Sequence, residues 1–256
     1  MNQNLIVILV ILLLASCSQL DTKNTSNTET KTENTQSQIP TTIDAKASEL
    51  ADATLLAMGG QQKYDDLHYV SWTFFGSRQL TWDKRDSRVR INSPKDTTIY
   101  LLDMKTMKGK ISKSGKEVTD PDALSEGLKR AKSIWINDSY WLVMPFKLKD
   151  PGVNLKYLRT DTTKTGAMAE VVELTFEGVG NTPNNKYDVF IDKKDNLVKQ
   201  WAFYADKNQE APSRVWPWDN YKDYNGLLLS GERSDDGGPS EIKVYEEMED
   251  SVFEVF

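Results

Sequence analysis

The sequence contains few of the side chains that most often bind metals or form disulfides. One cysteine, Cys17, and one histidine, His68, occur in 256 residues. A zinc site takes three or four ligands, usually His or Cys, so we expect no metal site. A lone cysteine has no intramolecular partner, so we expect the folded part of the chain to be stable through its core alone.

Motifs of catalysis and phosphate binding are also missing. No Gly-x-Ser-x-Gly segment accompanies His68, and Gly178-Val179-Gly180 lacks the Lys-Ser/Thr that completes a phosphate-binding loop. Paired carboxylates remain open as a catalytic device, because 38 acidic residues are present. The acidic run at residues 246–250 is more typical of a solvated edge or tail. We expect no catalytic residues and no cofactor.

Neither sign of charge dominates the chain. It carries 32 basic and 38 acidic residues, for a net charge of −6, and the two signs are interspersed. Nucleic-acid binding favours a basic patch, so we expect no nucleic-acid partner. A polybasic membrane-binding face is excluded on the same ground.

An apolar run opens the sequence but is too short to span a bilayer. Residues 5–15 are eleven consecutive apolar residues, against the ~20 that a spanning helix needs. The run fits the core of a secretory signal peptide, although residues 1–4 contain no Lys or Arg. No second apolar run long enough to cross a membrane follows Cys17.

The end of this run, Leu14-Ala15-Ser16-Cys17, resembles the lipobox of bacterial lipoproteins. The resemblance implies cleavage before Cys17, lipidation of its thiol and attachment to a membrane. The alternative is an ordinary signal peptide followed by an unmodified cysteine. Ser18 follows the cysteine where proteins retained in the inner membrane often have Asp, which favours the outer membrane.

The composition divides the chain into three parts. Residues 1–16 are expected to be the signal peptide, and residues 17–42 the lipidated cysteine and a disordered tether. The tether is mostly Thr, Asn, Ser, Gln, Glu and Lys, and such a segment buries too little apolar surface to offset the entropy of ordering. Residues 43–256 are expected to form a single domain.

Periodicity in this domain predicts two main helices among many strands. Residues 43–58 have helical spacing, with Thr42 as a cap and Gly59-Gly60 at the end. A second helix begins at Asp120 and Pro121 and carries an apolar stripe to Trp135. Residues 137–146 are an apolar link that either plugs the sheet or forms a lid. The last two predicted strands, residues 227–232 and 242–245, are expected to pair.

Most predicted strands follow one another through hairpin-length links, which indicates an antiparallel sheet. A sheet of about ten strands curls strongly. We therefore expect an α+β fold: a curved antiparallel sheet, forming an open half-barrel of about ten strands, with the two main helices against its concave face.

Aromatic residues are the most prominent feature of the domain, which holds seven Trp, ten Tyr and eight Phe. Val70, Trp72 and Phe74 alternate along one strand face, and Trp82 continues that face on the next strand. Trp135 ends the apolar stripe of the second helix. We predict that these five side chains line a ligand cavity between sheet and helix; the alternative is that they fill a solid core.

Two segments resemble exported lipoproteins with a LolA/LolB-like fold: residues 141–148, which read Trp-Leu-Val-Met-Pro-Phe-Lys-Leu, and residues 180–187, which read Gly-Asn-Thr-Pro-Asn-Asn-Lys-Tyr. The resemblance extends over nearly all of residues 43–256. It implies an open half-barrel whose hollow holds acyl chains of lipids or lipoproteins. The arginine latch of the family carrier matches none of Arg78, Arg88 and Arg90.

The sequence therefore predicts a non-enzymatic envelope lipoprotein that binds an apolar ligand, with the membrane and a lipid or lipoprotein as its partners. One alternative is a protein- or glycan-interaction module with a filled core on the same fold. Another is a hydrolase that uses paired carboxylates. The volume of the cavity separates the first two, and convergent acids in a cleft are required for the third.

Overall fold

The computed structural model describes residues 41–233 and 237–256. The predicted signal peptide, Cys17 with its lipobox, and the tether up to residue 40 lie outside the described residues, as does the Asp235-Asp236 turn. The first described residues are held against the domain. The Gly152 amide donates to Thr41 Oγ1 at 3.0 Å, and the Thr42 amide donates to Asn154 Oδ1 at 2.6 Å.

The first sheet is a seven-stranded antiparallel sheet with the order β14-β1-β2-β3-β4-β5-β6. Tight turns with left-handed residues join its consecutive strands, for example Ser87 (φ 59°) and Gly115 (φ 74°). Its strands are β1 (Tyr69–Phe74), β2 (Arg78–Asp83), β3 (Arg88–Ser93), β4 (Thr98–Asp103), β5 (Lys108–Lys113), β6 (Lys116–Glu117) and β14 (Pro239–Tyr245).

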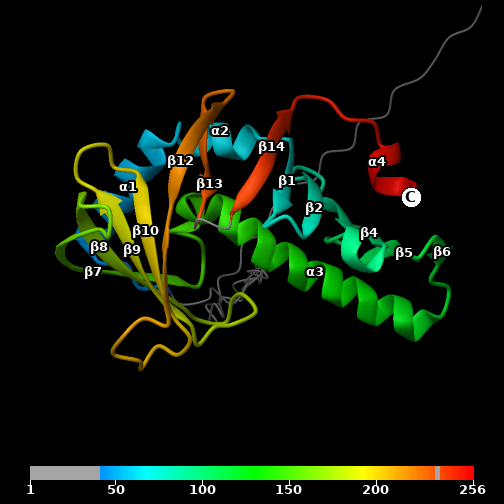
Figure 1. Cartoon of the computed structure of the whole chain (residues 1–256), viewed down its shortest axis with the longest axis horizontal. Helices are drawn as coiled ribbons and strands as arrows, with labels where there is room; N and C mark the ends of the chain where they lie inside the picture. Colours follow the sequence, from blue (N-terminus) through cyan, green and yellow to red (C-terminus); the bar gives the residue numbers. More distant parts are fainter. Residues whose placement is uncertain (1–40, 234–236) are drawn as a thin grey trace, which may run out of the picture. The chain divides into compact units, whose positions relative to one another are not determined.

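The second sheet is a five-stranded antiparallel sheet with the order β11-β10-β9-β8-β7, and a two-stranded ribbon, β12-β13, follows it. Figure 1 shows the ribbon between the two sheets. Hydrogen bonds join it to the second sheet, from the Trp218 amide to the Lys199 carbonyl and from the Tyr221 hydroxyl to the Val198 carbonyl, both at 2.8 Å. These strands are β7 (Val153–Thr162), β8 (Met168–Phe176), β9 (Lys186–Asp192), β10 (Val198–Tyr204), β11 (Arg214–Pro217), β12 (Asp219–Tyr224) and β13 (Leu227–Glu232).

The α+β class and the antiparallel, unclosed sheets agree with the sequence, but the single sheet of about ten strands is wrong. Between β6 and β7 the chain runs through α3 (Pro121–Val143) and the 3₁₀ turn η2 (Met144–Lys147), so these two strands do not pair. The expected last pair is also wrong: residues 227–232 pair with β12, and residues 239–245 return to β1.

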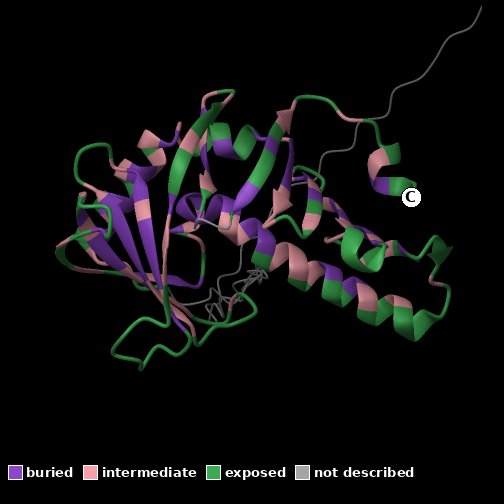
Figure 2. Cartoon of the chain, in the orientation of Figure 1, coloured by how far each residue is buried: buried purple, intermediate pink, exposed green. Residues whose placement is uncertain are grey.

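Helix α3 begins as its sequence predicts. Asp120 accepts a hydrogen bond from the Ala123 amide at 2.8 Å, and Pro121 occupies the first turn. The helix extends through residues 137–143, which the sequence suggested were a plug or lid. It ends at Val143, because Pro145, in the following turn η2, does not fit a helix interior. Figure 2 shows buried residues on its sheet-facing side and exposed ones opposite.

The two main helices do not share one concave face. Helix α3 packs on β3, β4 and β5 of the first sheet, whereas α1 (Ala45–Ala57) packs on β7 of the second. Asp44 caps α1 by accepting from the Ala47 amide at 2.7 Å, so the cap expected at Thr42 is wrong. Two short helices, α2 (Gln61–Asp66) and α4 (Ser251–Glu254), and one 3₁₀ turn, η1 (Pro94–Asp96), complete the described elements.

Three apolar clusters form the core, and we call the two larger ones the first and the second core. The first lies between the first sheet and α3 and includes Trp72, Leu80 and Ile91. The second lies against the second sheet and includes Leu50, Leu155 and Trp201. Among residues 41–233 and 237–256, no helix is long and apolar enough to cross a membrane.

Candidate functional site

The five predicted cavity residues belong to one apolar cluster, the first core. Val70, Trp72 and Trp82 are buried, at 0%, 1% and 7% exposed, and Phe74 and Trp135 are half-buried against them. The alternation of the strand and the stripe of the helix thus bring these side chains together from β1, β2 and α3. Val70 and Trp72 are as enclosed as any core side chain.

A hollow remains beside two of the five. Trp82 and Trp135 meet edge to face, with ring centroids 5.2 Å apart. With Ser87, Met104, Lys105 and Lys132 they line an open depression of about 240 Å³, which we call the Trp82–Trp135 hollow. Both indole Nε1 atoms are buried and lack a hydrogen-bond partner. Its volume is below the ~300 Å³ at which sites for whole small molecules begin.

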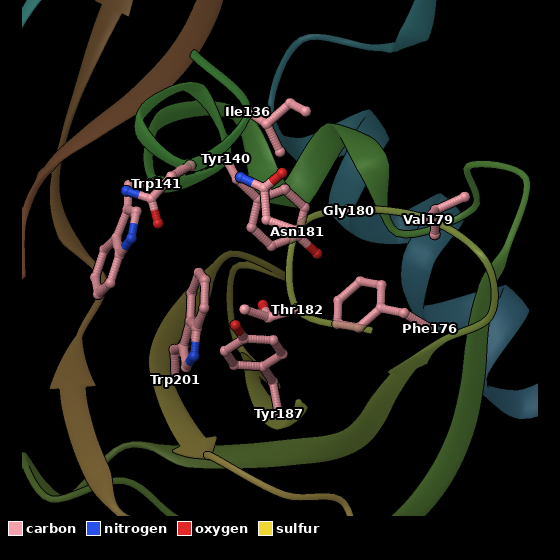
Figure 3. A pocket seen from close by; sticks show the side chains of 11 residues that line it. Ile136, Tyr140, Trp141, Phe176, Val179, Gly180, Asn181, Thr182, Tyr187 and Trp201 are labelled. Carbon is pink, nitrogen blue, oxygen red and sulfur yellow. The ribbon is translucent and has the colours of Figure 1, made fainter. Parts of the chain in front are cut away.

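The sequence did not predict a second hollow, which lies beneath the C-terminal half of α3 and which we call the aromatic cleft. It is about 120 Å³ in volume. Figure 3 shows its lining, contributed by α3, by the strands β8, β9 and β10, and by the β8–β9 link. The lining residues are Ile136, Asn137, Tyr140, Trp141, Phe176, Val179, Gly180, Asn181, Thr182, Tyr187 and Trp201.

Trp201 is the centre of the aromatic cleft. Trp141 stacks on it with centroids 5.0 Å apart and planes 12° apart. Tyr140 and Tyr187 meet it edge to face at 5.8 Å and 4.5 Å, and Phe176 meets both tyrosines in the same way. Edge-to-face and stacked pairs hold rings in fixed relative orientations, so the walls of this cleft are rigid.

Two polar atoms in this lining have no partner. The Tyr140 hydroxyl and the Trp201 Nε1 atom are buried and make no hydrogen bond. Burial holds the pKa of Tyr140 well above its usual value, with the nearby Tyr187 and Asp150 acting in the same direction, so its hydroxyl stays neutral. A buried polar group without a partner is uncommon in folded proteins, where the large majority are satisfied.

Arg233 lies between α3 and the ribbon. It is fully buried, and its guanidinium carbon lies 3.5 Å from the Trp218 ring centroid. It donates to the Trp141 carbonyl on α3 and, at 3.1 Å, to the Ser230 carbonyl on β13. Burial lowers the pKa of Arg233 to about 9. This cation ties α3 to the ribbon.

His68 lies beside two acidic residues, Asp83 and Asp86. His68 stacks on Tyr69, and its Nε2 lies 3.3 Å from Asp83 Oδ1. Asp83 already accepts two hydrogen bonds from Arg88, at 2.7 and 2.9 Å, and one from the Asp86 amide. His68, Asp83 and Asp86 each offer a ligand atom within 4.8 Å of the others, but Arg88 already pairs with the Asp83 charge. The acids of residues 246–250 are exposed along an open groove, as expected for a solvated run.

Comparisons with known proteins show similarity in structure only. No protein-family model and no curated protein matches the chain. A putative outer membrane lipoprotein-sorting protein domain from Vibrio parahaemolyticus is similar, with a TM-score of 0.41 and 10% identity over 81% of this chain and 96% of that one. A DUF1329 family protein from Desulfovibrio piger has a TM-score of 0.42 and 12% identity, over 82% of this chain and 97% of that one.

Proposed function

We propose that this chain is a non-enzymatic envelope lipoprotein, anchored at the outer membrane through Cys17, that binds an apolar ligand between the first sheet and α3. The ligand is a lipid or the acyl chain of a lipoprotein. The observation that carries the proposal is the Trp82–Trp135 hollow, where two large apolar side chains at the sheet–helix interface border open space.

The surroundings of the hollow suit an amphipathic ligand. Trp82 and Trp135 make it apolar, and Met104 in its lining is a flexible side chain that adapts to differently shaped partners. Lys105 and Lys132 stand in its lining, where they favour an anionic head group. At about 240 Å³ the hollow takes the end of a chain, and Val70, Trp72 and Phe74 are the apolar surface that a deeper ligand reaches if α3 moves outward.

Binding of palmitate to the mature protein tests the proposal. We expect palmitate to change tryptophan fluorescence saturably, and Trp135→Ala to weaken the binding by about tenfold or more, because truncating Trp135 removes much of the apolar surface that borders the hollow. The control is Leu56→Ala on α1, a side chain that is 78% exposed and distant from the hollow. Palmitate binding that is absent, or equal in wild type and Trp135→Ala, contradicts the proposal.

The anchor is tested separately. Mass spectrometry of the N-terminus, on protein purified from its own membrane, is expected to show cleavage before Cys17 and acyl chains on it. The Cys17→Ser variant is expected to lose the lipid. An unmodified Cys17 in the wild-type protein contradicts the lipoprotein reading but leaves the ligand site standing.

The filled packing around Val70 and Trp72 favours a second candidate, an interaction module on the same fold. In that case the domain recognises a partner through surface features rather than through an enclosed cavity. The two candidates differ in what native mass spectrometry of the purified protein shows: retained lipid supports the first, and lipid-free protein supports the second.

A further inference from the structure

We propose that the aromatic cleft beneath α3 is a second binding site, which takes one ring of a neutral sugar. The cleft is separate from the Trp82–Trp135 hollow, because no residue lines both. It lies on the second sheet and on the last turns of α3, whereas the hollow lies on the first sheet.

The charge of the lining selects a neutral ligand. None of the eleven residues around the cleft is Asp, Glu, Lys, Arg or His. The ionisable groups among them are tyrosines, and burial raises the pKa of both Tyr140 and Tyr187, so they stay neutral. A phosphate, carboxylate or ammonium group here is left without a counter-ion, which costs several kcal/mol in a buried site.

The unpartnered donors select a ligand with oxygen acceptors. The Tyr140 hydroxyl and the Trp201 indole N–H are buried without partners in the described structure. An alkyl chain in the cleft leaves both unsatisfied, at a cost of ~1–3 kcal/mol each. A hydroxyl or ring oxygen of a sugar accepts from them and removes that cost.

Asn181 adds an acceptor of its own. Its amide nitrogen donates to the carbonyl and to the hydroxyl of Ser133 on α3, both at 3.0 Å. This leaves the amide oxygen free to accept from a hydroxyl. Thr182 and Tyr187 are joined through the Asn185 amide, which donates to their hydroxyls at 2.8 and 3.4 Å, so both hydroxyls keep a hydrogen to donate.

The shape and size of the cleft suit one ring. A pyranose presents C–H groups on its flat face, and these carry partial positive charge that the negative face of an aromatic ring attracts. Phe176 and Tyr187 supply such rings here, whereas the faces of Trp201 are covered by Trp141 and by Trp218. The volume of about 120 Å³ is below the ~300 Å³ of sites that hold a whole small molecule, so the cleft holds a single residue of a longer glycan.

The test uses the mature protein with three neutral trisaccharides, namely maltotriose, cellotriose and triacetylchitotriose, and with trigalacturonate as the charged comparison. The readout is the set of seven tryptophan indole N–H signals in ¹⁵N NMR. We expect at least one neutral trisaccharide to shift the Trp141 and Trp201 signals saturably. Trigalacturonate is expected to leave them in place.

Tyr140→Phe is the decisive variant, because it removes the hydroxyl and keeps the ring. We expect its affinity for the bound trisaccharide to fall about tenfold. The matched control is Tyr100→Phe, the same change in β4 of the first sheet, which is expected to leave binding unchanged. The proposal is overturned if no neutral trisaccharide shifts these signals, if Tyr140→Phe binds as tightly as wild type, or if palmitate shifts the Trp201 signal in place of the sugars.

Discussion

Asp138 is a carboxylate that is completely buried on α3 and paired to one arginine. Arg78, in β2, donates to it twice, at 2.8 and 2.9 Å, and the Asn137 amide adds a third hydrogen bond at 3.0 Å. Such a pair sets where the helix lies on the sheet, because any shift of α3 separates two charges in a medium of low polarity.

Removing one partner of this pair is expected to lower the stability of the fold. Arg78→Met leaves the Asp138 carboxylate buried and uncompensated, which should lower the free energy of unfolding by ~3–5 kcal/mol in urea denaturation. Lys149→Met, which breaks an exposed pair with Asp52, should cost at most ~1 kcal/mol. The double variant Arg78→Met with Asp138→Leu should recover much of the loss. Equal losses in the two single variants would contradict this.

Tyr204 predicts a pH dependence of stability. Its hydroxyl donates to Asp188 Oδ2 at 3.1 Å, and burial together with the Asp188 carboxylate raises the pKa of Tyr204 from 10 to about 12. The folded state therefore favours the protonated phenol. Its contribution is fully present below pH 10 and is lost as the pH rises to about 12.

We therefore expect wild type, between about pH 9 and about pH 11, to lose on the order of 1 kcal/mol more unfolding free energy than Tyr204→Phe. Urea titrations at about pH 9 and about pH 11 measure the difference. Since the other titrating groups are common to both proteins, their contribution cancels. A constant difference between the two proteins over this range would refute the assignment.

Helix α3 approaches β4 and β5 closely through glycines. A Cβ at Gly127, in the helix, would lie 2.3 Å from Ile111 Cδ1, and one at Gly109, in β5, would lie 2.9 Å from Leu128 Cδ2 on the helix. Both distances are shorter than a van der Waals contact. The absence of side chains at these positions lets the helix reach the sheet.

Gly127→Ala is therefore expected to destabilise the protein, although alanine is intrinsically favoured over glycine in a helix by ~1 kcal/mol. The methyl group displaces the buried Ile111, and overpacking of this kind costs ~1–3 kcal/mol. Ser125→Ala, at an exposed position of the same helix, is the matched control and should be neutral or slightly stabilising. Thermal unfolding of the two variants decides: a higher midpoint for Gly127→Ala contradicts the close packing.

Local signals predicted most elements but not how the sheets are divided. Asp120 and Pro121 marked the start of α3 correctly, since a cap acts within one turn. The hairpin of β12 and β13 was missed, although its turn, Asn225-Gly226, has both residues at positive φ, a strong hairpin signal. The pairing of β14 with β1 joins distant segments, and no local pattern encodes which edge a late strand joins.

At the scale of the whole domain, the two cores are joined by shared elements. The end of α3 places Leu142 and Val143 in the first core, and the turn after it places Met144 in the second. Tyr221 of the ribbon packs against both. Loss of either core therefore removes support from the other.

We expect residues 41–256 to unfold in one cooperative transition. Far-ultraviolet circular dichroism and tryptophan fluorescence should give the same midpoint in urea, as two-state unfolding requires. Trp72→Phe in the first core and Trp218→Phe in the second should each shift both signals together. Two separate midpoints would show that the sheets are independent folding units.

Part of the Trp82–Trp135 hollow could be predicted from the sequence, whereas the aromatic cleft could not. Trp82 and Trp135 were found because alternation and helical spacing each identify one inward face, and these two faces meet. The aromatic cleft was not found, because Trp141, Phe176, Tyr187 and Trp201 come from four segments that meet only in the folded chain. The available signal was compositional: the domain holds seven tryptophans, and alternation and helical spacing placed only three of them.

The pairing of β1 with β14 determines when the first sheet can be completed during synthesis. Ser71 and Tyr245 lie 174 positions apart, yet their hydroxyls are 3.3 Å from each other. Since a chain is synthesised from its N-terminus, β1 keeps one unpaired edge until residues 239–245 emerge. A nascent or truncated chain that stops before β14 exposes that edge to other chains, which is a template for aggregation. The unpaired edge of β1 is therefore covered only after β14 has been synthesised.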